Sequence, residues 1–148
     1  MNKERPLALL GCGGLGIVFG VLVLLLGLMT LYLTLGSDAS NPRFLTEIGG
    51  EQNLGRFRAL YLLLSLEGFF LLFGSVYSLM RNPLGLILMK TFGSIACLHG
   101  LGILVYVMMT GNEPETAGGD MFRGIRYIAV GLIAWYVYTR SDVKAYFD

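Results

Sequence analysis

Three ionisable residues, Glu67, His99 and Arg126, fall inside long apolar stretches of the sequence. Ionisable groups in hydrocarbon are costly, and by default they face a bundle interior, a partner or an aqueous cavity. We call these three residues the polar cluster. Three interpretations remain open: a structural lock that fixes helix register, a proton relay or ligand site, and a docking site for a charged residue of another subunit.

Other kinds of chemistry have little support in the residue types. His99 is the sole histidine, and Cys97 points elsewhere on a helix, so the sequence offers no nucleophile beside a base and no pair of histidines for haem. Cys12 and Cys97 show no metal-ligand spacing. We therefore expect a protein that is not an enzyme, with no catalytic residue, no metal and no cofactor.

The charge balance excludes another class of partner. The chain has 11 basic and 10 acidic residues, a net charge of +1, and no basic stripe that could follow a phosphate backbone. We expect no nucleic acid and no soluble substrate. The expected partners are the lipid bilayer and other membrane subunits.

The elements that must position the polar cluster are membrane helices. Hydrophobic residues make up 55% of the 148 positions and charged residues 14%, and the mean hydropathy is +0.66. Soluble domains have about 25% charged residues. The sequence predicts an all-α integral membrane four-helix bundle, a single domain over residues 1–148. The expected helices cover about 7–35, 57–80, 84–110 and 121–139, with a short cytoplasmic tail over 141–148.

The link Arg81-Asn82-Pro83 makes the second and third helices antiparallel neighbours. At 1.5 Å per residue, Glu67 lies about 21 Å and His99 about 24 Å from the inner interface, and Arg126 lies at about 21 Å. The sequence therefore predicts that Glu67 and His99 meet at one depth. The longer connections are polar, and residues 43–48 form either a solvated loop or an interfacial amphipathic turn.

The first apolar segment raises two questions. Its start resembles a lipoprotein cleavage site, but the apolar run continues to Leu35 and we expect a retained helix. Small residues recur along it, and such spacing lets helix backbones approach closely, either for internal packing or for docking a partner. The glycines concerned are Gly13, Gly16, Gly20 and Gly27.

The distribution of basic residues orients the chain. With both termini on the cytoplasmic side, that side holds six basic residues against five on the other, which slightly favours this orientation. The six are Lys3, Arg5, Arg81, Lys90, Arg140 and Lys144, and the five are Arg43, Arg56, Arg58, Arg123 and Arg126.

The end of the chain resembles a known pattern. The aromatic residues Trp135, Tyr136 and Tyr138 lead into a tail in which Ser141, Val143, Lys144 and Phe147 match a Ser-x-Arg-Val-Lys-x-x-Phe-like segment. This is similar to an uncharacterised bacterial family of small four-pass inner-membrane proteins. The family also has a glutamate in the second helix and a short basic-proline link after it. The resemblance implies a bacterial inner membrane, and because the family has no assigned activity it suggests no particular reaction.

These observations favour a non-catalytic accessory subunit or assembly factor of a membrane protein complex. It would dock through the glycine-rich first segment and the tail over 141–148, because the loops are too small for a catalytic domain. The alternative is a small transporter or proton-coupled channel component that uses Glu67, His99 and Arg126. A polar cavity reaching Glu67 would favour the alternative.

Overall fold

The chain folds into a bundle of helices. The computed structural model describes residues 6–35, 42–47, 50–110 and 114–148, and in these ranges all regular structure is helical. The long helices are α1 (Leu7–Leu35), α3 (Leu54–Leu79), α4 (Leu84–Thr110) and α5 (Pro114–Thr139). Three short helices accompany them, namely α2 (Pro42–Glu47), the 3-10 turn η2 (Glu51–Asn53) and α6 (Ser141–Phe147).

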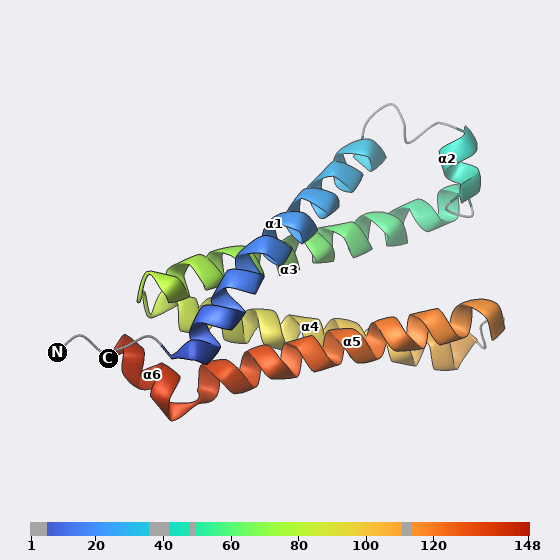
Figure 1. Cartoon of the computed structure of the whole chain (residues 1–148). Coiled ribbons are helices and arrows are strands. Elements are labelled where there is room, and N and C mark those ends of the chain that lie inside the picture. Colours follow the sequence, from blue (N-terminus) through green and yellow to red (C-terminus); the bar gives the residue numbers. More distant parts are fainter. Residues whose placement is uncertain (1–5, 36–41, 48–49, 111–113) are drawn as a thin grey trace.

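The long helices form two packed pairs, α1 with α3 and α4 with α5, and α3 joins the pairs by packing on α4. The pairs diverge toward the end of the molecule that carries α2 (Figure 1). The beginning of α1 and the helix α6 lie together at the opposite end (Figure 1). The four long helices therefore run alternately in the two directions.

Glycines bring α1 against α3. A Cβ added at Gly20 would lie 2.6 Å from the backbone nitrogen of Leu72, and one at Gly27 would lie 2.9 Å from that of Ser65. Gly13 and Gly16 likewise face α3 and are buried. All four predicted glycines therefore face α3: Gly20 and Gly27 lie against its backbone, and Gly13 and Gly16 lie against its side chains.

A second set of glycines does the same between α4 and α5. A Cβ at Gly100 would lie 2.5 Å from the carbonyl oxygen of Gly124, and one at Gly131 would lie 2.6 Å from that of Gly93. The sequence analysis did not single out these four residues, although each repeats at a spacing of seven on its helix. The helices α4 and α5, which carry His99 and Arg126, are therefore in close backbone contact.

The turn between α3 and α4 explains how they become neighbours. Arg81 has a positive φ of 60°, and the amides of Arg81 and Asn82 donate to the carbonyls of Ser78 and Tyr77, which closes the end of α3. Asn82 then begins α4, since its Oδ1 accepts a hydrogen bond from the amide of Leu84 at 3.0 Å. Pro83 lies just before Leu84, the first residue of α4, at a position where its missing N–H costs nothing. The predicted tight antiparallel link is confirmed.

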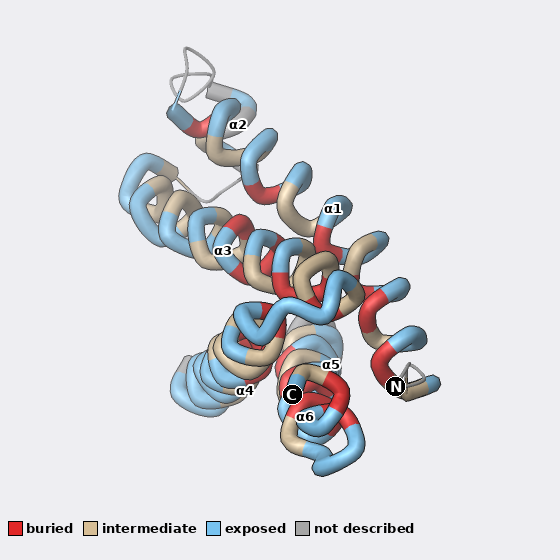
Figure 2. The backbone as a smooth tube through the Cα atoms, turned by 90° about the vertical axis from the view of Figure 1, so that its left-hand side faces the viewer, coloured by how far each residue is buried: buried red, intermediate tan, exposed pale blue. Residues whose placement is uncertain are grey.

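Many large apolar residues of the described chain are exposed, and the buried residues lie where the helices face one another (Figure 2). In the described part of the chain, three helical segments are long and apolar enough to cross a membrane: Leu7–Leu35, Glu51–Leu79 and Leu84–Met109. The 26-residue helix α5 is not among them, and Arg123 and Arg126 lower its hydropathy. An exterior of this kind suits hydrocarbon and not water.

Two connections differ from the prediction. The fourth helix begins at Pro114 and not near residue 121, so most of the expected loop over 111–120 is helical. Proline favours the first helical position because its φ is already set, which explains an earlier start than apolar content suggests. In the first long connection, Pro42–Glu47 is a short helix and not a plain loop. Ile48 lies outside the described residues.

The tail forms the helix α6, and one side of this helix packs against the bundle. Val143 and Tyr146 are buried in the same apolar cluster as Leu9 and Tyr138. The guanidinium of Arg81 lies 5.3 Å from the centre of the Tyr146 ring, at cation–π distance. The tail is therefore packed on the bundle, and only its other side, with Asp142 and Lys144, is exposed.

Candidate functional site

Glu67 on α3 and His99 on α4 are in direct contact, as their depths predicted. Nδ1 of His99 lies 2.7 Å from Oε1 of Glu67, and the two residues are 1% and 8% exposed. At this distance a proton lies between the nitrogen and the oxygen. This hydrogen bond gives each of the two buried side chains a partner away from water and links α3 to α4.

Tyr127 of α5 completes this contact. Its ring lies 4.5 Å from the His99 ring, centre to centre, with 35° between the planes. The sequence analysis missed this residue. In the sequence, the only indication of a role for Tyr127 is its position next to Arg126. Depth alone does not show in which direction an aromatic side chain points. One residue from each of α3, α4 and α5 thus meets at one level.

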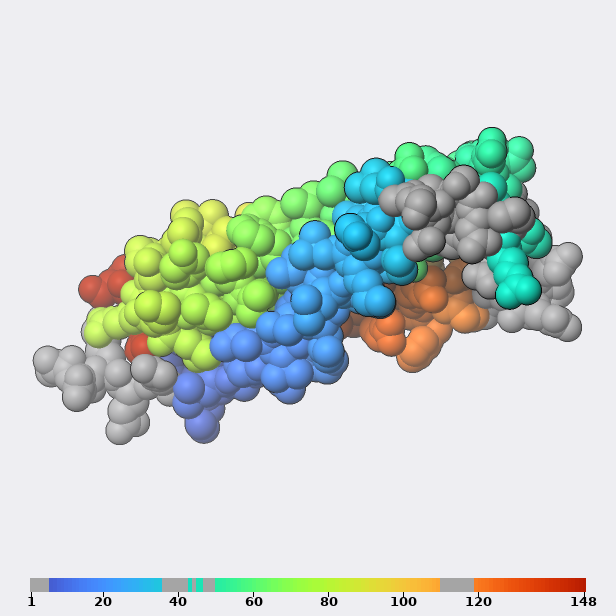
Figure 3. Space-filling view, turned by 90° about the horizontal axis from the view of Figure 1, so that it is seen from above, coloured from blue at the N-terminus to red at the C-terminus, as the bar shows by residue number. Residues whose placement is uncertain are grey.

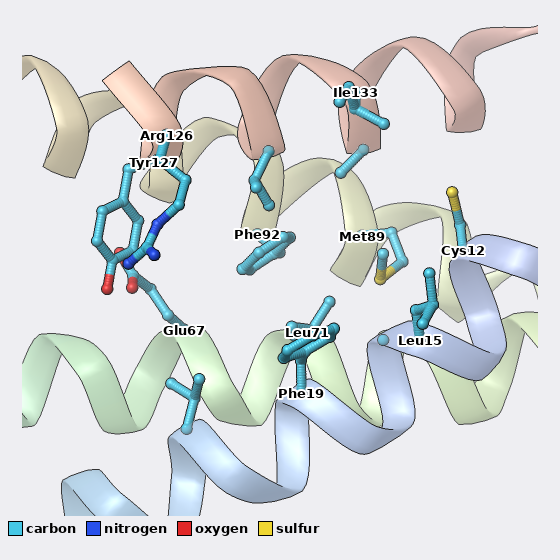
Figure 4. Close-up of a pocket in the computed structure, with 14 residues that line it drawn as sticks. Cys12, Leu15, Phe19, Glu67, Leu71, Met89, Phe92, Arg126, Tyr127 and Ile133 are labelled. Atoms are coloured by element: carbon cyan, nitrogen blue, oxygen red, sulfur yellow. The ribbon is translucent and has the colours of Figure 1, made fainter. Parts of the chain in front are cut away.

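Arg126 of α5 extends toward the contact between Glu67 and His99. Its side chain extends toward Glu67 and Tyr127 (Figure 4), yet no described acidic residue forms an ion pair with its guanidinium. The residue is exposed, whereas Glu67 is buried. The structure therefore brings together all three predicted members of the polar cluster, but Arg126 borders an open space and is not locked into the Glu67–His99 pair.

That space is a cavity between α1 and α5, which we call the side cavity. It has a volume of about 540 Å³, and Glu67, Leu71, Met89 and Phe92 of α3 and α4 contribute to its lining. Arg126, Tyr127 and Glu67 gather at one end, and Cys12 and Leu15 lie at the other (Figure 4). Ligand pockets have this character, apolar over most of the wall with a few converging polar groups.

α1 also presents a face directed away from α3. Gly11 and Gly14 have nothing within 4 Å of an added Cβ, in contrast to the four glycines that contact α3. We define the outer face of α1 as these two glycines and the exposed apolar side chains that continue their spacing of three and four. The face consists of Gly11, Gly14, Val18, Leu22, Leu25 and Met29. Figure 3, seen from above, shows α1 lying uncovered on the bundle.

Arg58, which the sequence analysis considered only as one of the basic residues that orient the chain, contacts the end of α1. Its Nε and Nη2 donate to the carbonyl oxygen of Thr34 at 3.2 and 2.6 Å. Thr34 is in the last turn of α1, where carbonyls lack intrahelical partners and a positive charge is favourable. Arg58 therefore ties the beginning of α3 to the end of α1.

Metal and thiol chemistry gain no support from the described residues. No group of three His, Cys, Asp or Glu side chains there is placed to hold a metal ion. Cys12 and Cys97 are free thiols, and the Cys97 thiol lies 3.7 Å from the carbonyl oxygen of Ile128.

Comparison with protein-family models, with curated proteins and with solved structures finds no match for this chain.

Proposed function

We propose that this chain is a non-catalytic accessory subunit or assembly factor of a membrane protein complex. It crosses a bacterial inner membrane four times through α1, α3, α4 and α5, with both termini on the cytoplasmic side. The start of α1 and the helix α6 lie at the same end of the bundle, which supports an even number of crossings (Figure 1). The resemblance of the tail to small four-pass inner-membrane proteins supports the choice of membrane.

The outer face of α1 carries the proposal. Glycine within a helix costs about 1 kcal/mol relative to alanine, and within the described part of the chain nothing lies within 4 Å of a Cβ added at Gly11 or Gly14. Small residues followed by exposed leucines form the kind of surface on which membrane helices associate, because their backbones can come close. The glycines used internally are different ones. We therefore place the docking surface on Gly11 and Gly14 and not on the four glycines predicted first.

The test is purification in mild detergent from the native membrane after replacing Gly14 with Val. Loss of the co-purifying chains, with unchanged monodisperse elution and melting temperature, is the expected result. Gly20→Val is the matched control: it disturbs the fold itself, because the added atoms meet the backbone of Leu72. A wild-type chain that purifies alone and binds nothing would contradict the proposal, as would a Gly14→Val chain that keeps its partners.

A second candidate is favoured by one observation, namely that a cavity reaches Glu67 and Arg126. In this case the chain is a component of a small transporter or proton-coupled channel, and the Glu67–His99 pair exchanges its proton during the cycle. Proteoliposomes with a pH-sensitive dye in the lumen test this function. Proton flux that is lost in Glu67→Gln but kept in Gly14→Val would select it over the accessory role.

A further inference from the structure

The side cavity opens toward lipid. Leu15 and Phe19 on α1 and Val130 and Ile133 on α5 border it and are 63%, 55%, 44% and 56% exposed. Phe19 lies about 18 Å along α1 from its first residue, and Val130 lies about 14 Å from the last residue of α5. The mouth is therefore at a depth where the surroundings are hydrocarbon, and whatever enters it must be dissolved in the bilayer.

The end of the side cavity at Arg126 offers hydrogen-bond donors. A guanidinium has five N–H donors and no acceptor capacity, and no described acidic residue pairs with that of Arg126. Oε1 of Glu67 is taken by His99. The guanidinium of Arg126 is therefore the group at this end that can receive an anionic ligand, and a carboxylate matches the planar fork of arginine.

The size and depth of the side cavity limit the rest of the ligand. From Arg126 to Ala134, both of which line it, the distance along α5 is about 12 Å. Its polar end lies at the level of Gly100, since Gly124 and Ile128 on either side of Arg126 contact that residue. Gly100 is about 15 Å from the last residue of α4. A hydrated phospholipid headgroup is poorly suited to this depth, whereas a single carboxyl group is small enough.

We propose that the side cavity binds a single-chain lipid that ends in a carboxylate. The carboxylate lies against Arg126, and the hydrocarbon chain runs between α1 and α5 toward Cys12. This binding site depends on neither of the two functions above. A docked partner would use the outer face of α1, which points away from α3, while the cavity uses Leu15 and Phe19 on the side of α1 that faces α5.

The experiment measures equilibrium binding of radiolabelled hexadecanoate to the purified full chain in nanodiscs of zwitterionic phospholipid. Hexadecanol and methyl hexadecanoate serve as competitors that keep the chain and lose the charge. Arg126→Gln removes the cation, and Val130→Trp fills the cavity. Leu98→Trp is the matched control, because Leu98 is 69% exposed on α4 and does not line the cavity.

We expect saturable binding of about one hexadecanoate per chain. Arg126→Gln weakens it at least tenfold and leaves hexadecanol binding unchanged, Val130→Trp abolishes both, and Leu98→Trp changes neither. Equal competition by hexadecanoate and its methyl ester would overturn the proposal, as would full binding in Arg126→Gln or Val130→Trp. Each variant must elute as the wild type does. If either fails, Arg126→Met, which also removes the cation, or Ile133→Trp takes its place with the same expected direction.

Discussion

The side chains of Glu67 and His99, 32 residues apart in sequence, meet with Nδ1 of the imidazole 2.7 Å from Oε1 of the carboxyl group. Both are almost completely buried, and they come from helices joined by the short turn over residues 80–83. The turn makes the helices antiparallel, and the similar distance of Glu67 and His99 from the turn along their helices brings the two groups to nearly one level. The Tyr127 ring then covers the imidazole from α5.

This pair predicts non-additive mutational effects. Glu67→Leu or His99→Leu alone leaves a buried polar group without a partner and should lower the free energy of unfolding by about 1–3 kcal/mol. The double variant should lose less than the sum, because no orphaned group remains. SDS titration in mixed micelles, applied as a double-mutant cycle, measures the coupling. Additive losses would show that the contact has no energetic role.

The glycine contacts of α4 predict a contrast between two neighbouring positions. Gly100→Val should reduce stability by about 1–3 kcal/mol, because the added atoms meet the Gly124 carbonyl and the Ile128 backbone. Gly102→Val should leave the melting temperature nearly unchanged, since nothing lies within 4 Å of its added Cβ. Circular dichroism in detergent follows both. A larger loss at Gly102 than at Gly100 would mean that the α4–α5 contact is placed wrongly.

The left-handed backbone at Arg81 predicts a preference for glycine over a branched residue. Arg81→Gly relieves about 1 kcal/mol of backbone strain and gives up about 0.5–1 kcal/mol of cation–π attraction to Tyr146, so the melting temperature should hardly move. Arg81→Val should lower it clearly, because a β-branched residue is an outlier at φ 60°. Equal melting temperatures for the two variants would refute the role of the turn.

The hydrogen bonds of Arg58 predict local fraying of α1. Arg58→Met should remove about 1.5–3 kcal/mol of charge-assisted hydrogen bonding and speed amide exchange in the last turn of α1, around Thr34. Hydrogen–deuterium exchange with mass spectrometry provides the measurement. Arg56→Met is the control, because Arg56 is exposed near the same end of α3. Equal exchange in the two variants would argue against the Arg58 contact.

The exposed Arg140–Asp142 pair predicts a weak acid-side pH dependence. Two hydrogen bonds from Arg140, each 3.0 Å, lower the pKa of Asp142 from its usual 3.8. A carboxyl whose pKa is lowered by folding stabilises the fold above the unfolded pKa, and this contribution is lost as the pH falls through the folded value. An NMR titration of Asp142 should therefore have its midpoint below 3.8 and shift upward in Arg140→Gln. An unchanged midpoint would show that the pair does not form in solution.

Periodicity and depth were enough to predict much of the site. The length of the apolar runs predicts four long helices, and the short Arg81-Asn82-Pro83 link predicts which two are neighbours, because three residues cannot span a bundle. The level of Glu67 and His99 then follows from a rise of 1.5 Å per residue. The start of α5 was misplaced, because apolar content identifies a membrane segment and not the full extent of the helix.

Only the tertiary structure decided how the residues at that level are used. The sequence shows the glycines of α1, but not that Gly13, Gly16, Gly20 and Gly27 face α3 while Gly11 and Gly14 face outward, since that depends on the rotation of the helix against its neighbour. Likewise, the depth of Arg126 says nothing about direction. The packing of α5 on α4 turns its Tyr127 onto His99 and leaves Arg126 at the edge of a cavity, because neighbouring residues on a helix point about 100° apart.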